Sequence, residues 1–216
     1  MPVEYEPFEI FGRALHYTPV CDACLAADAA RRKEEMAIKS KARRRSWFEA
    51  ITPPLYRETR CENLLPAFKN AVESWEVDES IALVGYSGSG KTRTGYLLLE
   101  KAAMEGFSIQ VANLATFQTL VLGQFSDNPG LKRSSLEKLD SLMSAHVILL
   151  DDLGKTTFSD RVETELYNLL EHRTAHHKIT IWTSNSEKML IRSKLSDDRA
   201  EPILRRLLLN TKVVKV

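Results

Sequence analysis

The sequence has little of what defines a secreted or membrane-bound chain. Its 216 residues include only three cysteines, an odd number too small for a disulfide framework. No run of about 18 apolar residues occurs, so we expect no membrane-spanning helix. Residues 1–7 (MPVEYEP) lack the basic and apolar regions of a secretory signal. We therefore expect neither a disulfide-rich scaffold nor a membrane protein.

The net charge is also small, at +1, but it is unevenly distributed. Residues 31–45 (RRKEEMAIKSKARRR) carry eight basic and two acidic side chains. Because Ala, Arg, Lys and Glu favour helices, we expect a basic helix over roughly 22–50. This helix is either a solvated connection between two modules or a contact to nucleic acid or an acidic partner. The sequence does not separate these alternatives.

Two consecutive prolines, Pro53 and Pro54, indicate a boundary, because the residue before proline is pushed out of the helical region. We expect a small helical head over 1–51 and a larger domain over 52–216. In the larger domain, apolar runs of strand length alternate with helical patterns. The expected strands are 80–84, 108–112, 146–151, 179–184 and 212–216, and the expected helices are 91–105, 113–122, 134–144, 160–175 and 198–209. The alternation predicts an α/β fold with a five-stranded parallel sheet between helices.

A phosphate-binding loop follows the first expected strand. It comprises Gly85, Tyr86, Ser87, Gly88, Ser89, Gly90, Lys91 and Thr92. This is the complete G-x-x-x-x-G-K-[ST] pattern, placed between a strand and a helix. Lys91 would supply charge to the β- and γ-phosphates, and the Thr92 hydroxyl would ligate Mg²⁺. The loop predicts a P-loop NTPase that binds ATP and Mg²⁺, and with so few cysteines we expect it in the cytoplasm.

Two carboxylates, Asp151 and Asp152, end the expected strand at 146–151. At the carboxyl edge of a parallel sheet they would lie beside the phosphate loop, on a neighbouring strand. We expect Asp151 to hold Mg²⁺ and Asp152 to orient and polarise an attacking water. The alternative is a plain turn or helix cap after a strand.

A polar amide, Asn185, follows the next expected strand, which ends in Trp-Thr-Ser. If this strand lies next to the one that carries the two aspartates, Asn185 reaches both the water and the γ-phosphate. Asparagine also suits a turn that leaves a strand, so the structural alternative stays open.

Together these motifs resemble the AAA+ helicase-loader ATPases, the DnaC/DnaI/IstB group that is related to the DnaA initiator. The resemblance covers 52–216 and rests on the phosphate loop, LLDDLG at 149–154, LLEHR at 169–173 and WTSN at 182–185. It implies an ATPase of AAA+ type that binds the replicative DNA helicase and single-stranded DNA and helps to place the helicase on DNA. Alternatives are an IstB-type transposition ATPase and a non-hydrolysing adaptor switched by ATP.

The resemblance also implies self-association through the ATP site. Arg206, followed by Leu207, best matches the family's arginine finger, which projects into the ATP site of a neighbouring subunit, and Arg205 is the second candidate. Two arginines that cap the end of a helix are the structural alternative. The sequence ends at Val216, directly after the last expected strand. We therefore expect no C-terminal helical lid, and slow hydrolysis without partner and DNA.

In this family the region between the second and third strands carries the DNA-binding helices. In this sequence that region is 113–145, and its candidates for contact with single-stranded DNA are Thr116, Lys132 and Arg133. Lys132 and Arg133 are equally typical of a solvated loop.

The head contains Cys21 and Cys24, which have the spacing of one half of a zinc site. His16, Cys61 or an oxygen ligand would have to complete a site for Zn²⁺ within one chain, or two chains would share four cysteines. Two small thiols beside a turn are the alternative. A loader-type head would contact the helicase.

Overall fold

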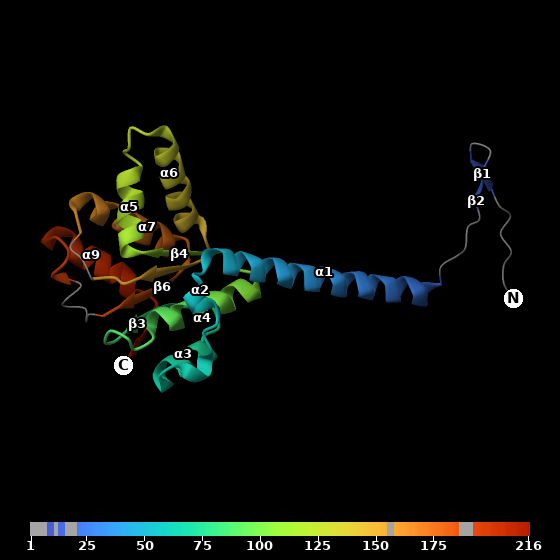
Figure 1. Ribbon diagram of the computed structural model, residues 1–216, viewed down its shortest axis with the longest axis horizontal. Coiled ribbons are helices and arrows are strands. Elements are labelled where there is room, and N and C mark those ends of the chain that lie inside the picture. Colours follow the sequence, from blue (N-terminus) through green and yellow to red (C-terminus); the bar gives the residue numbers. More distant parts are fainter. Residues whose placement is uncertain (1–7, 11–12, 16–20, 155–157, 186–191) are drawn as a thin grey trace. The chain divides into compact units, whose positions relative to one another are not determined.

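The computed structural model describes residues 8–10, 13–15, 21–154, 158–185 and 192–216 (Figure 1). The chain forms two compact units, Met1–Arg43 and Arg44–Val216. In the first unit, β1 (Phe8–Ile10) pairs antiparallel with β2 (Arg13–Leu15). Helix α1 (Asp22–Ile51) begins in this unit and ends before the two prolines, as expected. Within the described residues, no helix has the length and apolar character needed to cross a membrane.

The last turns of α1 belong to the second unit. Phe48 is only 1% exposed and lies in the same hydrophobic core as Phe68 and Leu99, and Arg44 donates a hydrogen bond to the Met104 carbonyl at 2.8 Å. The boundary between the units therefore lies between Arg43 and Arg44 and not at 51–52, where the prolines placed it. The prolines end the helix, but the apolar residues before them are what tie its end to the core.

The second unit contains the expected five-stranded parallel sheet. Its strands are β3 (Ser80–Val84), β4 (Ile109–Asn113), β5 (Val147–Asp151), β6 (Ile179–Ser184) and β7 (Thr211–Lys215). The order across the sheet is β4-β5-β6-β3-β7, and every hydrogen-bonded pair is parallel. All five expected strands are confirmed to within one residue at each end.

Helices cover both faces of this sheet (Figure 1). The described helices that follow β3 are α4 (Lys91–Glu105), α5 (Leu114–Gly123), α6 (Pro129–Ser144), α7 (Asp160–Ala175) and α9 (Asp197–Leu208). Three shorter elements that the sequence pattern did not predict precede β3, namely α2 (Pro54–Arg57), the 3₁₀-helix η1 (Cys61–Asn63) and α3 (Pro66–Ser74).

The two-residue period of the strands divides the core into two layers. Ile81 and Leu83 of β3 face the side that α3, α4 and the end of α1 cover. Ala82 and Val84 face the side that α5, α6, α7 and α9 cover. Because both of their faces are buried, β3 from Ile81 to Val84 and β5 from Val147 to Leu150 are continuously apolar, as is typical of parallel sheets.

A buried arginine holds the amino-terminal edge of the sheet together. Arg173, near the end of α7, is 1% exposed and donates to the carbonyls of Leu142, Ala145, His146 and Ile179 and to the Thr180 hydroxyl. Burial lowers the pKa of Arg173 to about 9, so the side chain stays protonated at neutral pH. One side chain thus ties α7 to the end of α6 and to the starts of β5 and β6.

We predict that Arg173→Met destabilises the fold by at least about 3 kcal/mol, because several buried carbonyls lose their hydrogen-bond donor at once. The free energy of unfolding, from urea titration followed by circular dichroism, measures this. The matched control is Arg133→Met, which removes an exposed arginine paired with Glu137 and should cost less than about 0.5 kcal/mol. Equal losses in the two variants would contradict the role assigned to Arg173.

Candidate functional site

The phosphate loop connects the end of β3 to the start of α4, as its motif predicted. Gly88 and Gly90 have φ angles of +84° and +95°, a left-handed conformation that residues with a Cβ rarely adopt. Gly85 is required for a different reason, since a Cβ there would lie 2.6 Å from a methyl carbon of Val216. The glycines let the backbone turn sharply over the first turn of α4, where free N–H groups and the helix dipole favour an anion.

The side chain of Lys91 lies inside this loop. It is 5% exposed, and its Nζ donates to the Tyr86 carbonyl at 2.7 Å. Burial lowers the pKa of Lys91, and the negative charges of Asp152 and Asp151 oppose that shift. The loop therefore encloses a cation in the position that the pattern reserves for contact with phosphates.

Asp151 connects the loop to the sheet. Its Oδ1 accepts hydrogen bonds from the Thr92 hydroxyl at 3.0 Å and from the Thr183 hydroxyl at 2.6 Å. Burial raises the pKa of Asp151, and the bonds from Thr183 and Thr92 partly offset the shift. A half-buried carboxylate beside a threonine hydroxyl fits Mg²⁺, which proteins commonly bind with one or two carboxylates together with substrate phosphates.

The strand that carries Asp151 is not hydrogen-bonded to β3, contrary to the expectation from sequence. β6 lies between β5 and β3. From this intervening strand, the Thr183 hydroxyl bonds to Asp151 at the end of β5. This hydroxyl also accepts a hydrogen bond from the Asp152 backbone N–H at 2.9 Å. Thr183 is fully buried and was not among the predicted site residues, although it lies within the WTSN stretch at 182–185 on which the resemblance rests.

Asp152 and Asn185 line one cleft with the phosphate loop. The cleft has a volume of about 310 Å³, and its lining residues from the phosphate loop are Ser87, Gly88, Gly90, Lys91 and Thr92. Asp152 has a φ of +63°, so the chain turns directly after β5, and Asn185 is exposed. The structure thus brings together the loop, both aspartates and Asn185.

One part of the lining of this cleft was not predicted, an aromatic wall at Tyr56. Leu55 and Tyr56 of α2 and Arg93 of α4 line it, and the Tyr56 ring stacks on Tyr96 with centroids 4.7 Å apart. Burial, chiefly, raises the pKa of Tyr96 to about 12, so this phenol is neutral. The lining of the cleft therefore combines a cation, Lys91, that suits phosphates with an aromatic ring, Tyr56, that suits a planar group.

Arg206 lies on α9, across the sheet from α4, and it is bound within its own chain. It forms an ion pair with Glu171 of α7, donates to the Tyr167 hydroxyl at 2.9 Å and stacks over the Tyr167 ring. Arg205 beside it is exposed and has no hydrogen bond or ion pair to any residue that the structure describes. Of the two arginines, Arg205 is the one that reaches solvent without breaking a contact.

The three candidates for contact with DNA lie on the α5–α6 helix pair (Figure 1). Thr116 is in the first turn of α5, where its backbone N–H bonds to the Asn113 side chain. Lys132 and Arg133 are exposed in the first turn of α6. In the connection between α5 and α6, Phe125 is exposed, and the Arg161 guanidinium lies 3.9 Å from its ring centroid. The structure therefore groups Lys132 and Arg133 on α6 and places Thr116 on the other helix.

The thiols of Cys21 and Cys24 are exposed and lie 3.1 Å apart at the start of α1. A tetrahedral zinc site would need two further ligands beside them. His16 lies outside the described residues, and among those described no three His, Cys, Asp or Glu side chains are placed to hold a metal ion. The zinc site stays a prediction.

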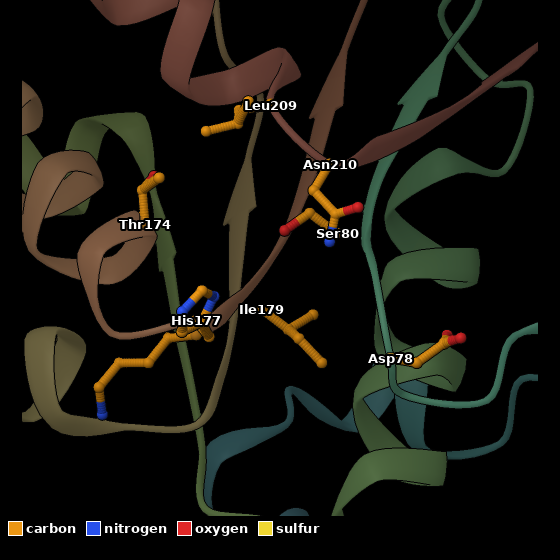
Figure 2. A pocket seen from close by; sticks show the side chains of 8 residues that line it. Asp78, Ser80, Thr174, His177, Ile179, Leu209 and Asn210 are labelled. Carbon is orange, nitrogen blue, oxygen red and sulfur yellow. The ribbon is translucent and has the colours of Figure 1, made fainter.

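A separate cleft of about 390 Å³ lies at the opposite edge of the sheet, where β3 and β6 begin (Figure 2). Asp78 and His177 lie on its two sides, and Ile179 and Leu209 contribute apolar surface. None of the predicted site residues lines it. Since open α/β sheets bind ligands beyond the carboxyl ends of their strands, the cleft at the phosphate loop is the candidate nucleotide site.

Comparison with known proteins points in the same direction as this geometry. The model of the family described as "IstB-like ATP binding protein" matches residues 67–216. A search of curated proteins gave no match.

Several solved structures share the fold. The crystal structure of DnaI has a TM-score of 0.61 and 18% identity, with 76% of this chain and 91% of that chain covered. The DnaC helicase loader has a TM-score of 0.57 and 16% identity, covering 76% and 99%. The replication initiator DnaA bound to AMPPCP and single-stranded DNA has a TM-score of 0.58 and 18% identity, covering 76% and 50%. This chain thus spans about half the length of that initiator, and identities this low establish the fold alone.

We predict that Thr183→Val weakens Mg²⁺-dependent nucleotide binding about 10-fold, because Asp151 loses a hydrogen bond that orients it. Titration with a fluorescent ATP analogue, with and without Mg²⁺, measures the effect. The same change at Thr164, which bonds only to the Asp160 carbonyl, is the control and should leave binding unchanged. If Thr183→Val binds the ATP analogue as tightly as the parent does, the Thr183 hydroxyl does not contribute to nucleotide binding.

Proposed function

We propose, from the premise that this chain belongs to the IstB-like ATP-binding family, that it is an ATP-dependent loader of the replicative DNA helicase that also binds single-stranded DNA. The fold is that of the DnaC/DnaI/IstB group of AAA+ ATPases. The observation that carries the proposal is the single cleft that joins Lys91, Asp152 and Asn185. The first unit, up to Arg43, would be the head that contacts the helicase.

Each of these residues has a separate role in the proposed hydrolysis. Lys91 contacts the β- and γ-phosphates, while Thr92 and Asp151 hold Mg²⁺, which neutralises charge on the phosphate oxygens when bound. Asp152 accepts a proton from the attacking water, and Asn185 positions that water against the γ-phosphate. Leu55 and Tyr56 contact the base. Because Asn185 is exposed in the single chain, we expect hydrolysis to be slow until a partner closes the cleft.

The α5–α6 pair supports a contact to single-stranded DNA. Lys132 and Arg133 supply charge for the phosphates, and Phe125 beside Arg161 supplies an aromatic surface for a base. Thr116, at the other end of α5, would extend this contact toward the sheet. DNA bound to the initiator in one related structure is consistent with this proposal but is a property of that protein.

A transposition ATPase of IstB type is the second candidate, because the matching family is described as IstB-like. The two candidates share the nucleotide cleft and differ in the partner. Stimulation of ATP turnover by a hexameric helicase favours the loader, whereas stimulation only by a transposase favours the second candidate.

We expect Lys91→Ala to abolish ATP binding, because it removes the cation enclosed by the loop. Asp152→Asn should retain binding but lose at least about 100-fold in turnover with helicase and DNA present, since an amide does not accept the proton of the water. Phosphate release and nucleotide titration measure the two effects. If the unmutated chain binds ATP but shows no turnover in any partner mixture, the result supports a non-hydrolysing adaptor instead.

Self-association through the ATP site makes a separate prediction. The contacts of Arg206 support a structural role, and the exposure of Arg205 supports Arg205 as the residue that enters a neighbour's site, although the family pattern favours Arg206. An arginine supplied in trans contributes about 10³–10⁵-fold to related reactions. We therefore expect Arg205→Ala to lose assembly-dependent turnover while Arg206→Ala loses stability.

Mixing each arginine variant with Lys91→Ala tests this assignment. One variant keeps an intact cleft and the other an intact arginine, so a mixture recovers activity only if the arginine acts between subunits. Recovery with Arg206→Ala and not with Arg205→Ala would reverse the assignment. If neither mixture recovers activity although the chains assemble, the trans mechanism is wrong.

A further inference from the structure

The first unit carries a long, unpaired basic surface that the nucleotide cleft does not use. Every residue from Cys21 to Arg43 is exposed, and this part of α1 includes no buried side chain. Its largest apolar residues, Met36 and Ile38, are 71% and 63% exposed. A helix without a buried apolar stripe gains nothing from packing in an apolar groove.

Most of the cations on this surface lack a carboxylate partner. Among the described residues, the ion pair between Arg31 and Asp28 at 3.0 Å is the only one formed by residues 21–43. The basic side chains without an ion pair are Arg32, Lys33, Lys39, Lys41 and Arg43. Residues 31–43 carry six basic side chains against the two acidic ones of Glu34 and Glu35. Among the described residues only Asp28 forms an ion pair with one of these cations, so the segment keeps a net positive charge.

The spacing of three of these cations suits a repeating anion. Arg32, Lys39 and Arg43 are separated by seven and four residues, which places them along one side of a helix. At a rise of about 1.5 Å per residue, they lie about 10 Å and about 6 Å apart along the axis. Such a row of charges complements the regular phosphates of a nucleic acid backbone.

We propose that residues 31–43 of α1 bind the phosphate backbone of nucleic acid without reading its sequence. Long, flexible basic side chains contact phosphates as point charges, and the segment offers no aromatic side chain for stacking on bases. The site is separate from α5–α6 and does not depend on ATP. It gives the chain a second contact with nucleic acid, on the other side of the boundary between the units.

The test uses the full chain with the triple substitution Arg32→Gln, Lys39→Gln and Arg43→Gln, since glutamine is neutral and favours helix. Fluorescence anisotropy with labelled oligonucleotides of two unrelated sequences, from about 50 to about 200 mM NaCl, measures affinity and its salt dependence. We expect at least a 10-fold loss at the lower salt concentration. The slope of log affinity against log salt should fall in magnitude by about 2, and equally for both sequences.

Two matched variants isolate the cause. Arg60→Gln, Lys69→Gln and Lys212→Gln together remove three cations from the second unit and should leave the affinity near that of the parent. Arg32→Lys, Lys39→Arg and Arg43→Lys together keep the charges and should retain binding. Lys132→Glu with Arg133→Glu tests the α5–α6 contact separately, so failure of that contact is distinguishable from failure of the contact made by α1. ATP binding and far-UV circular dichroism confirm that each variant is folded.

Four results would overturn the proposal. The first is parental affinity and salt slope in the glutamine triple variant. The second is an equal loss of affinity in the triple variant of the second unit, which would show that the effect depends only on the net charge of the chain. The third is unchanged DNA binding together with weaker binding of the helicase, which would identify an acidic protein surface as the partner of the helix. Loss of binding in the charge-retaining variant would also contradict a phosphate contact.

Discussion

The hydrogen bonds of the Asp151 carboxylate are the constraint around which the nucleotide cleft is built. Asp151 ends β5, Thr92 begins α4 and Thr183 lies near the end of β6, yet the three side chains meet within 3.0 Å contacts. The same Thr183 hydroxyl accepts a hydrogen bond from the backbone N–H of Asp152. One hydroxyl on the intervening strand thus fixes both aspartates relative to the phosphate loop. Displacing β6 by one residue would exchange the faces of its side chains and separate them all.

The sheet keeps this arrangement rigid by burying its strands on both faces. Two helical layers cover it, and consecutive residues of β3, β5 and β6, which face opposite layers, are buried. At the amino-terminal edge, Arg173 binds the starts of β5 and β6 and the end of α6. The ends of the sheet therefore have different tasks: one is held by a buried cation and the other presents polar side chains to a ligand.

Charge that the core does not use is concentrated in two places. Arg206 is drawn onto α7 by Glu171 and Tyr167, whereas Arg205 beside it stays exposed. In the first unit, the basic part of α1 is exposed along its whole length, with a single ion pair among the residues described. Because an unpaired exposed cation contributes little to folding, these residues are better explained by contacts with other molecules.

The sequence by itself determined the five strands of the sheet, the longer helices and the local site. Strand-length apolar runs, the phosphate loop and the prolines after α1 act through short-range preferences of the backbone, so their positions followed from pattern alone. The order of the strands, the bridge made by Thr183, the aromatic wall at Tyr56 and the capture of Arg206 by α7 depend on residues far apart in the chain. Each is a contact between side chains whose partners only packing selects. For the same reason the core, and not the prolines, decided where the two units divide.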